Sequence, residues 1–138
     1  MADTVTFKDI ERLLLAKLPE LHELVEKQFG SYYDLNTETP EAYPVFEDVL
    51  QKFLLDLLSS GDPGAILPRI FAFLEEMANS ADRDVTDLLG IAILEPLVFK
   101  PERIRIAWPY MGRRTKELAH ETAQFGGWLN NLPAEESD

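Results

Sequence analysis

The sequence predicts an all-α fold, in which a single domain of about six to seven helices packs as antiparallel pairs, either as an α-solenoid-like array or as an irregular bundle. Two observations predict it. Apolar residues recur at helical spacing along most of the chain, and the alternation typical of a strand covers only residues 103–108. With 138 residues, 46% of them hydrophobic, the chain has the size and composition of one globular domain. We expect this domain to cover residues 1–132 and residues 133–138 to form a polar tail.

The clearest helical patterns lie in the middle of the chain. Residues 45–58 carry two adjacent apolar rows, and residues 66–77 repeat this pattern. A third helix should run over residues 84–99, with Asp84 as its N-cap. This helix is apolar on nearly all sides, so we expect it at the centre of the fold. Pro96 should kink it or end it early.

Shorter amphipathic segments flank these three helices. Thr6 and Asp9 resemble a capping box, in which both side chains bond to backbone amides at the start of a helix. Prolines separate several of the segments, because proline lacks the amide that a helix interior needs. The flanking helices are expected at residues 10–18, 21–29 and 101–108, and in a final segment marked by Leu118, Thr122, Phe125 and Leu129.

The composition excludes several classes of chemistry. The chain has no cysteine, which excludes disulfides, thiol catalysis and thiolate metal ligands. Its first residues lack the basic start and apolar run of a secretory signal, and its apolar stretches are far shorter than the roughly 20 residues that span a membrane. We therefore expect a soluble, cytoplasmic protein with no membrane partner.

The formal net charge of −12 is unevenly distributed. Residues 31–98 hold thirteen Asp and Glu residues against three Lys and Arg residues, whereas residues 99–128 carry a net charge of +3. A mostly acidic body argues against nucleic acid as a partner, because phosphate binding depends on Lys and Arg. The charge favours a basic protein partner; the alternative is that it serves solubility alone.

Catalytic motifs are scarce. The two histidines, His22 and His120, are far apart in the sequence, and neither has a second metal ligand one helical turn away. No glycine-rich segment continues into the Lys-Ser/Thr pair of a phosphate-binding loop, and the acidic turn at residues 82–87 lacks the glycine of a calcium loop. We therefore predict no enzyme activity and no catalytic, cofactor-binding or metal-binding residues.

Glu95 breaks the local pattern, because it lies in the most apolar stretch of the chain, residues 89–97. A buried carboxylate without a partner is costly, so we expect a buried charge that is paired or hydrogen-bonded. The positive partner could be Arg103, Arg105 or Arg69. Such a pair would be either a structural tether for the third helix or a functional group.

Five segments between residues 43 and 119 carry a resemblance to a known family. They are Val45-Phe-Glu-Asp-Val-Leu50, Ile70-Phe-Ala-Phe-Leu-Glu-Glu-Met77, Asp82-Arg-Asp-Val-Thr-Asp87, Leu88-Leu-Gly-Ile-Ala-Ile-Leu-Glu95 and Met111-Gly-Arg-Arg-Thr115. In these segments the chain resembles an uncharacterised family of small, all-helical bacterial proteins that look like immunity proteins of polymorphic or contact-dependent toxin systems. The resemblance implies stoichiometric binding of a toxin and no catalytic residue.

A protein that blocks a basic toxin domain, such as a nuclease, needs a surface that attracts and anchors it. We expect that surface within residues 34–87, where carboxylates steer a basic partner and tyrosines anchor it. The alternative function is an intracellular helical-repeat adaptor that binds a peptide or protein, and for each single residue the alternative is an ordinary solvated position. The predicted partner-binding residues are Asp34, Glu38, Glu41, Tyr32, Tyr33, Tyr43, Glu75, Glu76, Asp82 and Asp84.

Overall fold

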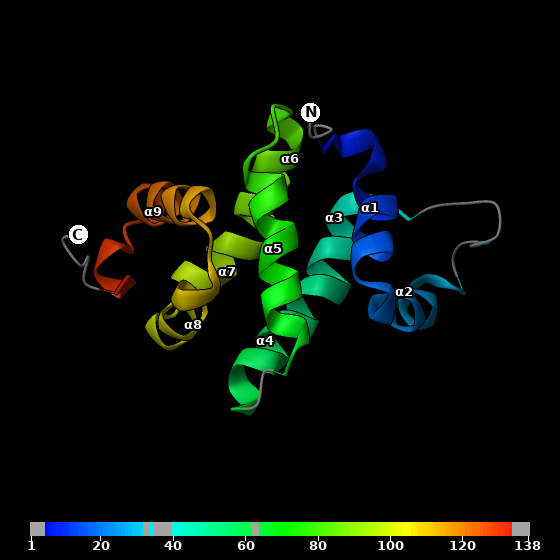
Figure 1. Cartoon of the computed structure of the whole chain (residues 1–138), viewed down its shortest axis with the longest axis horizontal. Coiled ribbons are helices and arrows are strands. Elements are labelled where there is room, and N and C mark those ends of the chain that lie inside the picture. Colours follow the sequence, from blue (N-terminus) through cyan, green and yellow to red (C-terminus); the bar gives the residue numbers. More distant parts are fainter. Residues whose placement is uncertain (1–4, 32–33, 35–39, 62–63, 134–138) are drawn as a thin grey trace.

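The computed structural model describes residues 5–31, 34, 40–61 and 64–133. Every regular element in these residues is helical, which confirms the predicted all-α class (Figure 1). Within the same residues, no helix is both long enough and apolar enough to cross a membrane. Predictions that fall on residues 1–4, 32–33, 35–39, 62–63 or 134–138 lie outside the described residues.

The three helices predicted in the middle of the chain are present. Residues 42–60 form one continuous helix and residues 83–98 form another, and in both the middle segment is π-helical, with wider turns than an α-helix. The elements are η1 (Phe7–Asp9), α1 (Ile10–Lys17), η2 (Pro19–Leu21), α2 (His22–Phe29), α3 (Ala42–Val45), η3 (Phe46–Leu50), α4 (Gln51–Ser60), α5 (Ile66–Ala78), α6 (Arg83–Leu88), η4 (Leu89–Leu94), α7 (Glu95–Val98), α8 (Pro101–Ala107), η5 (Trp108–Tyr110), α9 (Arg113–Gly126) and η6 (Leu129–Asn131).

Asp82 joins the starts of two helices. One oxygen of its carboxylate accepts a hydrogen bond from the amide of Asp84 at the start of α6 (3.0 Å). The other oxygen accepts one from the amide of Phe7 at the start of η1 (2.8 Å). The sequence suggested Asp84 as the N-cap of the third helix, but the N-cap is Asp82. The predicted capping box at Thr6 is also absent, because the Thr6 hydroxyl donates to the Asp9 carboxylate (3.3 Å) and not to the backbone. The Asp82 carboxylate accepts from the first amide of η1 in its place.

Pro96 does not end its helix early, because the helix continues to Val98. The irregularity lies in front of it, in η4. A proline lacks the amide that would bond to the carbonyl four residues earlier, which here is Ala92. The side-chain amide of Gln51, at the start of α4, donates to that carbonyl instead (2.7 Å). The two long helices are thus joined at their π-helical turns.

All helices share one hydrophobic core. Figure 1 shows α5 crossing the front, with α1 and α2 on one side and α8 and α9 on the other. Both α1 and α9 contact α5, and η3 contacts η4. Such contacts between elements distant in sequence distinguish an irregular bundle from a solenoid, in which each repeat contacts only its neighbours. The largest fully buried side chains include Phe46, Leu50, Phe71, Phe73 and Leu74.

Candidate partner-binding surface

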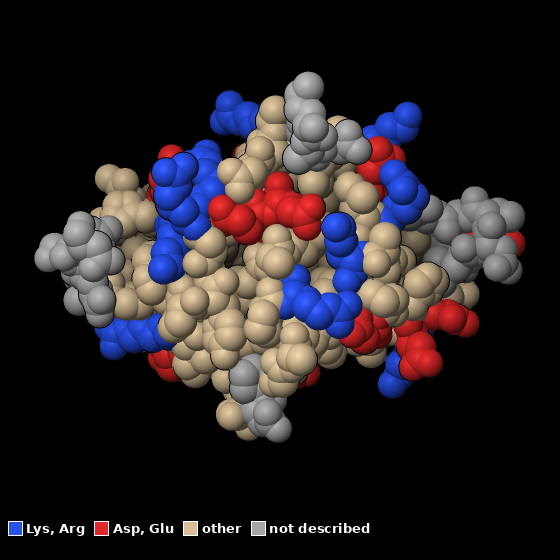
Figure 2. Space-filling view, viewed as in Figure 1, with Lys and Arg blue, Asp and Glu red and all other residues tan. Residues whose placement is uncertain are grey.

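The face that α5 crosses carries charges of both signs, and Figure 2 shows acidic and basic clusters side by side on it. Two ion pairs link α5 to the N-terminal helices: Lys17 with Glu76 (3.9 Å), and Arg69 with Glu20. Glu76, a predicted partner-binding residue, is exposed and takes part in the first pair. Residues 34–87 therefore do not form one uniform acidic face, because a helix points neighbouring residues in different directions.

Of the five predicted residues between α2 and α3, four lie within residues 32–38. Tyr32, Tyr33 and Glu38 lie outside the described residues. Asp34 is described and exposed. The binding role of these four residues stays a prediction.

Other predicted residues gather where α3 and α6 begin. The Tyr43 side chain is half-buried there. Burial raises the pKa of its hydroxyl, and three nearby negative charges raise it further, those of Asp87, Asp84 and Glu47. The structure thus places Tyr43 and Asp84, both predicted, beside two carboxylates that the sequence did not single out. We call Tyr43, Glu47, Asp84 and Asp87 the acidic surface.

Glu41 adjoins this surface on the other side of Tyr43. It is exposed and precedes the first residue of α3. Beside it is a small open cavity of ≈ 350 Å³, where the ring of Tyr43 lies 6.2 Å from that of Phe7. Glu11 also lines the cavity, and burial raises the pKa of its carboxyl. Glu41 and Tyr43 therefore flank one hollow, as neighbouring binding residues would.

Glu75 is hydrogen-bonded inside the fold. From α5 its carboxylate reaches the first turn of α9, where it accepts the hydroxyl of Thr115 (2.7 Å), the amide of Thr115 (2.9 Å) and the amide of Arg114 (3.1 Å). Asn79 donates another hydrogen bond (3.1 Å). Burial raises the pKa of Glu75, but these hydrogen bonds outweigh it and hold the pKa below the ordinary value of 4.5. Two predicted partner-binding residues, Glu75 and Asp82, thus cap helices.

The prediction of a buried charge at Glu95 is wrong, because its side chain is exposed. The apolar composition suggested burial on all sides, yet from Arg83 to Glu95 the helix keeps a narrow exposed stripe, with Asp84 exposed beside its first residue. Among the described residues, no ion pair involves Glu95. The stripe consists of Arg83, Asp87, Ile91 and Glu95.

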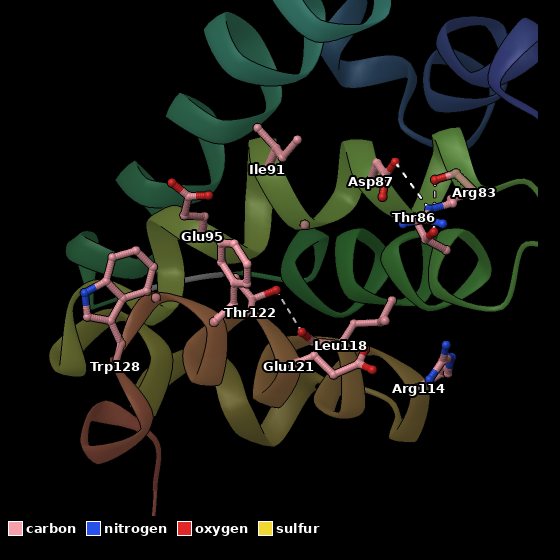
Figure 3. A pocket seen from close by; sticks show the side chains of 13 residues that line it. Arg83, Thr86, Asp87, Ile91, Glu95, Arg114, Leu118, Glu121, Thr122 and Trp128 are labelled. Carbon is pink, nitrogen blue, oxygen red and sulfur yellow. Dashed lines mark hydrogen bonds and ion pairs between the residues drawn. The ribbon is translucent and has the colours of Figure 1, made fainter.

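An open groove of ≈ 760 Å³ runs between this stripe and α9 (Figure 3). At Gly90 the two walls come close, because a Cβ there would lie 3.9 Å from the hydroxyl of Thr122. Ile91 is 51% exposed and Phe125 is 96% exposed. The residues that line the groove include Asp87, Gly90, Ile91 and Glu95 on one wall and Arg114, Leu118, Glu121, Thr122 and Phe125 on the other.

The segment that follows Phe125 closes one end of the groove. Gly127 ends α9 in a left-handed conformation (φ 80°), and the amide of Trp128 then donates to the carbonyl of Ala123 (2.7 Å). The indole of Trp128 lies on Gly126, where a Cβ would come within 2.4 Å of the ring. Trp128 therefore packs inward, while Phe125 faces solvent.

The sequence did not predict this groove, and none of its ten partner-binding candidates lines it. The predicted final helix is present as α9, but it ends before Leu129, which lies in η6, and the predicted apolar row is not the buried face of α9. The fully buried positions of α9 are the small residues Thr115, Ala119 and Ala123. This row of small residues is the feature of the sequence that could have indicated the groove. If the small residues form the buried face, the larger apolar side chains of α9 must lie on another surface.

The described residues contain no group of three or more His, Asp or Glu side chains placed to hold a metal ion. Both histidines are exposed, His22 on α2 and His120 on α9. The distinctive features are a tyrosine among carboxylates and, sharing Asp87 with it, an apolar groove.

One family matches most of the chain. The model of a family described as a domain of unknown function (DUF7674) matches residues 11–127. No curated protein and no solved structure matches the chain. The matched range includes the acidic surface and every groove residue except Trp128.

Proposed function

The chain belongs to the DUF7674 family, and we propose that it binds one basic protein partner, a toxin domain that it holds inactive as an immunity protein. The observation that carries the proposal is the acidic surface, in which Tyr43 lies among Asp84, Asp87 and Glu47. The resemblance to immunity proteins supports a toxin as the partner.

The acidic surface has the two components of a fast and tight interface. Carboxylates attract a basic partner over a distance and raise the rate of association, and the net charge of −12 adds to that field. A tyrosine supplies an amphipathic anchor with little conformational entropy to lose. Asp82 caps the start of α6, so the backbone that carries Asp84 and Asp87 is ordered before the partner arrives.

Binding at this surface accounts for inhibition without catalysis. A basic nuclease cleft binds phosphates through Lys and Arg, and a surface of carboxylates can occupy the same cleft. The proposal therefore requires a stoichiometric complex that weakens as salt is added, because screening acts on exposed charges.

The test is co-expression with the protein encoded immediately upstream. We expect that protein to stop growth alone and to be neutralised by this chain, with one complex that dissociates at high salt. The variant Asp84→Asn with Asp87→Asn should lose about tenfold or more in affinity. The matched control is Glu23→Gln with Glu26→Gln, which removes the same charge from exposed positions of α2.

Two results would contradict the proposal. One is an upstream protein that is harmless and does not bind. The other is equal weakening by both double variants, which would indicate attraction by net charge without a defined surface.

The second candidate is an intracellular adaptor that binds a helix or peptide, and the groove between α6–α7 and α9 favours it. An adaptor predicts binding through the groove in the absence of a toxic neighbour. Variants at Asp84 and Asp87 would then leave cell growth unaffected, which separates the two functions.

A further inference from the structure

The groove exposes apolar side chains that the fold does not use. Phe125 projects from α9 with 96% of its surface exposed, and Ile91 lies on the opposite wall with 51% exposed. Single exposed apolar residues are ordinary, but here two of them line the same hollow from opposite walls. A hollow with exposed apolar side chains and charged side chains around them is typical of a surface that a partner covers.

Among the described residues, only some of the charged side chains that line the groove form ion pairs. Its two arginines have acidic neighbours: Arg83 lies 4.0 Å from Asp87, and Arg114 lies 3.0 Å from Glu117. Glu95 and Glu121 take part in no ion pair among the residues that the structure describes. Figure 3 shows these two carboxylates on different walls, Glu95 on the helix of residues 83–98 and Glu121 on α9. Each wall of the groove therefore presents a carboxylate that is in no ion pair among the described residues, together with an exposed apolar side chain.

The helical walls of the groove also limit the backbone conformation of a bound segment. Both are helices, and the described residues contain no strand, so the groove offers no row of backbone amides and carbonyls to pair with. An extended peptide would leave its own backbone groups unpaired against these walls, whereas a helix satisfies them internally. The stripe from Arg83 to Glu95 extends over about 18 Å, which equals about three helical turns.

We propose that this groove binds an amphipathic helix of a protein partner, whose apolar ridge covers Ile91 and Phe125 and whose flanking Lys or Arg side chains pair with Glu95 and Glu121. The proposal goes beyond the toxin assignment, because it names a recognition element and does not depend on what the partner does. A second copy of this chain fits less well, since two copies at −12 repel each other.

A synthetic helix tests the proposal directly. The probe is a peptide of about 14 residues with leucines at helical spacing and lysines on both sides of them. In a Trp108→Phe background, Trp128 is the one remaining tryptophan and lies at the end of the groove. We expect a saturable change in its fluorescence, and little change with a peptide of the same composition in scrambled order.

Charge reversal shows whether the groove is the site. Glu95→Lys with Glu121→Lys should weaken binding about tenfold or more, and a peptide with glutamates in place of lysines should then bind better than the original. The matched control is Glu23→Lys with Glu26→Lys on α2, which makes the same change in net charge and should keep most of the affinity.

Three results would overturn the proposal. The first is no saturable binding of the lysine–leucine helix, and the second is equal loss in the groove variant and its control. The third is self-association that Phe125→Ser abolishes, which would assign the groove to a second copy. Because no toxin is used, each of these leaves the co-expression test with the upstream protein to judge the proposed function separately.

Discussion

The carboxylate of Glu75 accepts the hydroxyl and the amide of Thr115 across 40 residues of sequence, and so fixes the start of α9 against α5. The hydroxyl of Thr115 belongs to the one fully buried polar side chain among the described residues. Without Glu75 this hydroxyl and two amides of α9 would lose their acceptor. Glu75 thus holds the first turn of α9, the helix that forms one wall of the groove, while the buried residues of α9 pack it against α5, α7 and η4.

Glu75→Ala should therefore lower the free energy of unfolding by about 2 kcal/mol, because buried donors are left without an acceptor. Urea unfolding checks the value. The neighbouring Glu76→Ala serves as control and should change stability by no more than about 0.5 kcal/mol, since its pair with Lys17 is exposed and long. Equal losses in the two variants would count against the capping role.

Gly112 should be required only while Glu75 is present. A Cβ at residue 112 would lie 2.4 Å from the carboxyl carbon of Glu75, which the hydrogen bonds to α9 hold in place. Gly112→Ala is expected to cost about 1–2 kcal/mol in the native sequence and distinctly less in Glu75→Ala. A double-mutant cycle by urea unfolding measures the difference, and additive losses would contradict the proposed contact.

The lowered pKa of Glu75 predicts a specific dependence of stability on pH. The folded chain favours the ionised carboxylate, so its contribution is fully present above the unfolded pKa of about 4.5 and is lost as pH falls through the lower folded pKa. The stability difference between the native chain and Glu75→Gln should therefore shrink as pH falls below about 5. Unfolding by urea at several pH values tests this, and a difference that stays constant with pH would refute it.

Local patterns predicted the helices, because apolar periodicity and proline positions act over short stretches of chain. They failed where a distant group decides the outcome. Glu75 and Asp82 look like solvated acids in the sequence. The packing of α5 against α9 gives Glu75 the amides that donate to it, and the packing of η1 against α6 gives Asp82 a second donor, the amide of Phe7, besides the local amide of Asp84. The prediction of a buried Glu95 failed for a related reason, because an apolar composition does not say which side of a helix stays exposed.

The segments that carry the family resemblance are now explained largely by structure. Two of them, residues 45–50 and 88–95, contain the π-helical turns that contact each other. Two others, residues 70–77 and 111–115, meet at the Glu75 cap. The segments of residues 82–87 and 88–95 also supply one wall of the groove, but its other wall comes mostly from α9 beyond Thr115, outside the five segments, so the groove could not be predicted from them alone.

Gln51 should matter because of Pro96. Its amide donates to the carbonyl of Ala92, for which Pro96 provides no amide. Gln51→Ala is expected to cost about 1–2 kcal/mol, and less in a Pro96→Ala background, where a backbone amide is available again. Thermal and urea unfolding of the four proteins in this cycle measure the coupling. The exposed neighbour Lys52→Ala is the control and should be close to neutral.

The two aromatic residues at the end of α9 should respond in opposite ways. Trp128 packs on Gly126 and edge-on against Phe99, with the ring centroids 5.6 Å apart, so Trp128→Ala should cost about 2 kcal/mol. Phe125 is almost fully exposed, so Phe125→Ser should leave the unfolding free energy within about 0.5 kcal/mol of the native value. A large loss in Phe125→Ser would show that this ring supports the fold. Retained stability with lost binding of the lysine–leucine helix would show that Phe125 acts at the surface, since only a role in contact with a partner gives an exposed aromatic ring an effect of that kind.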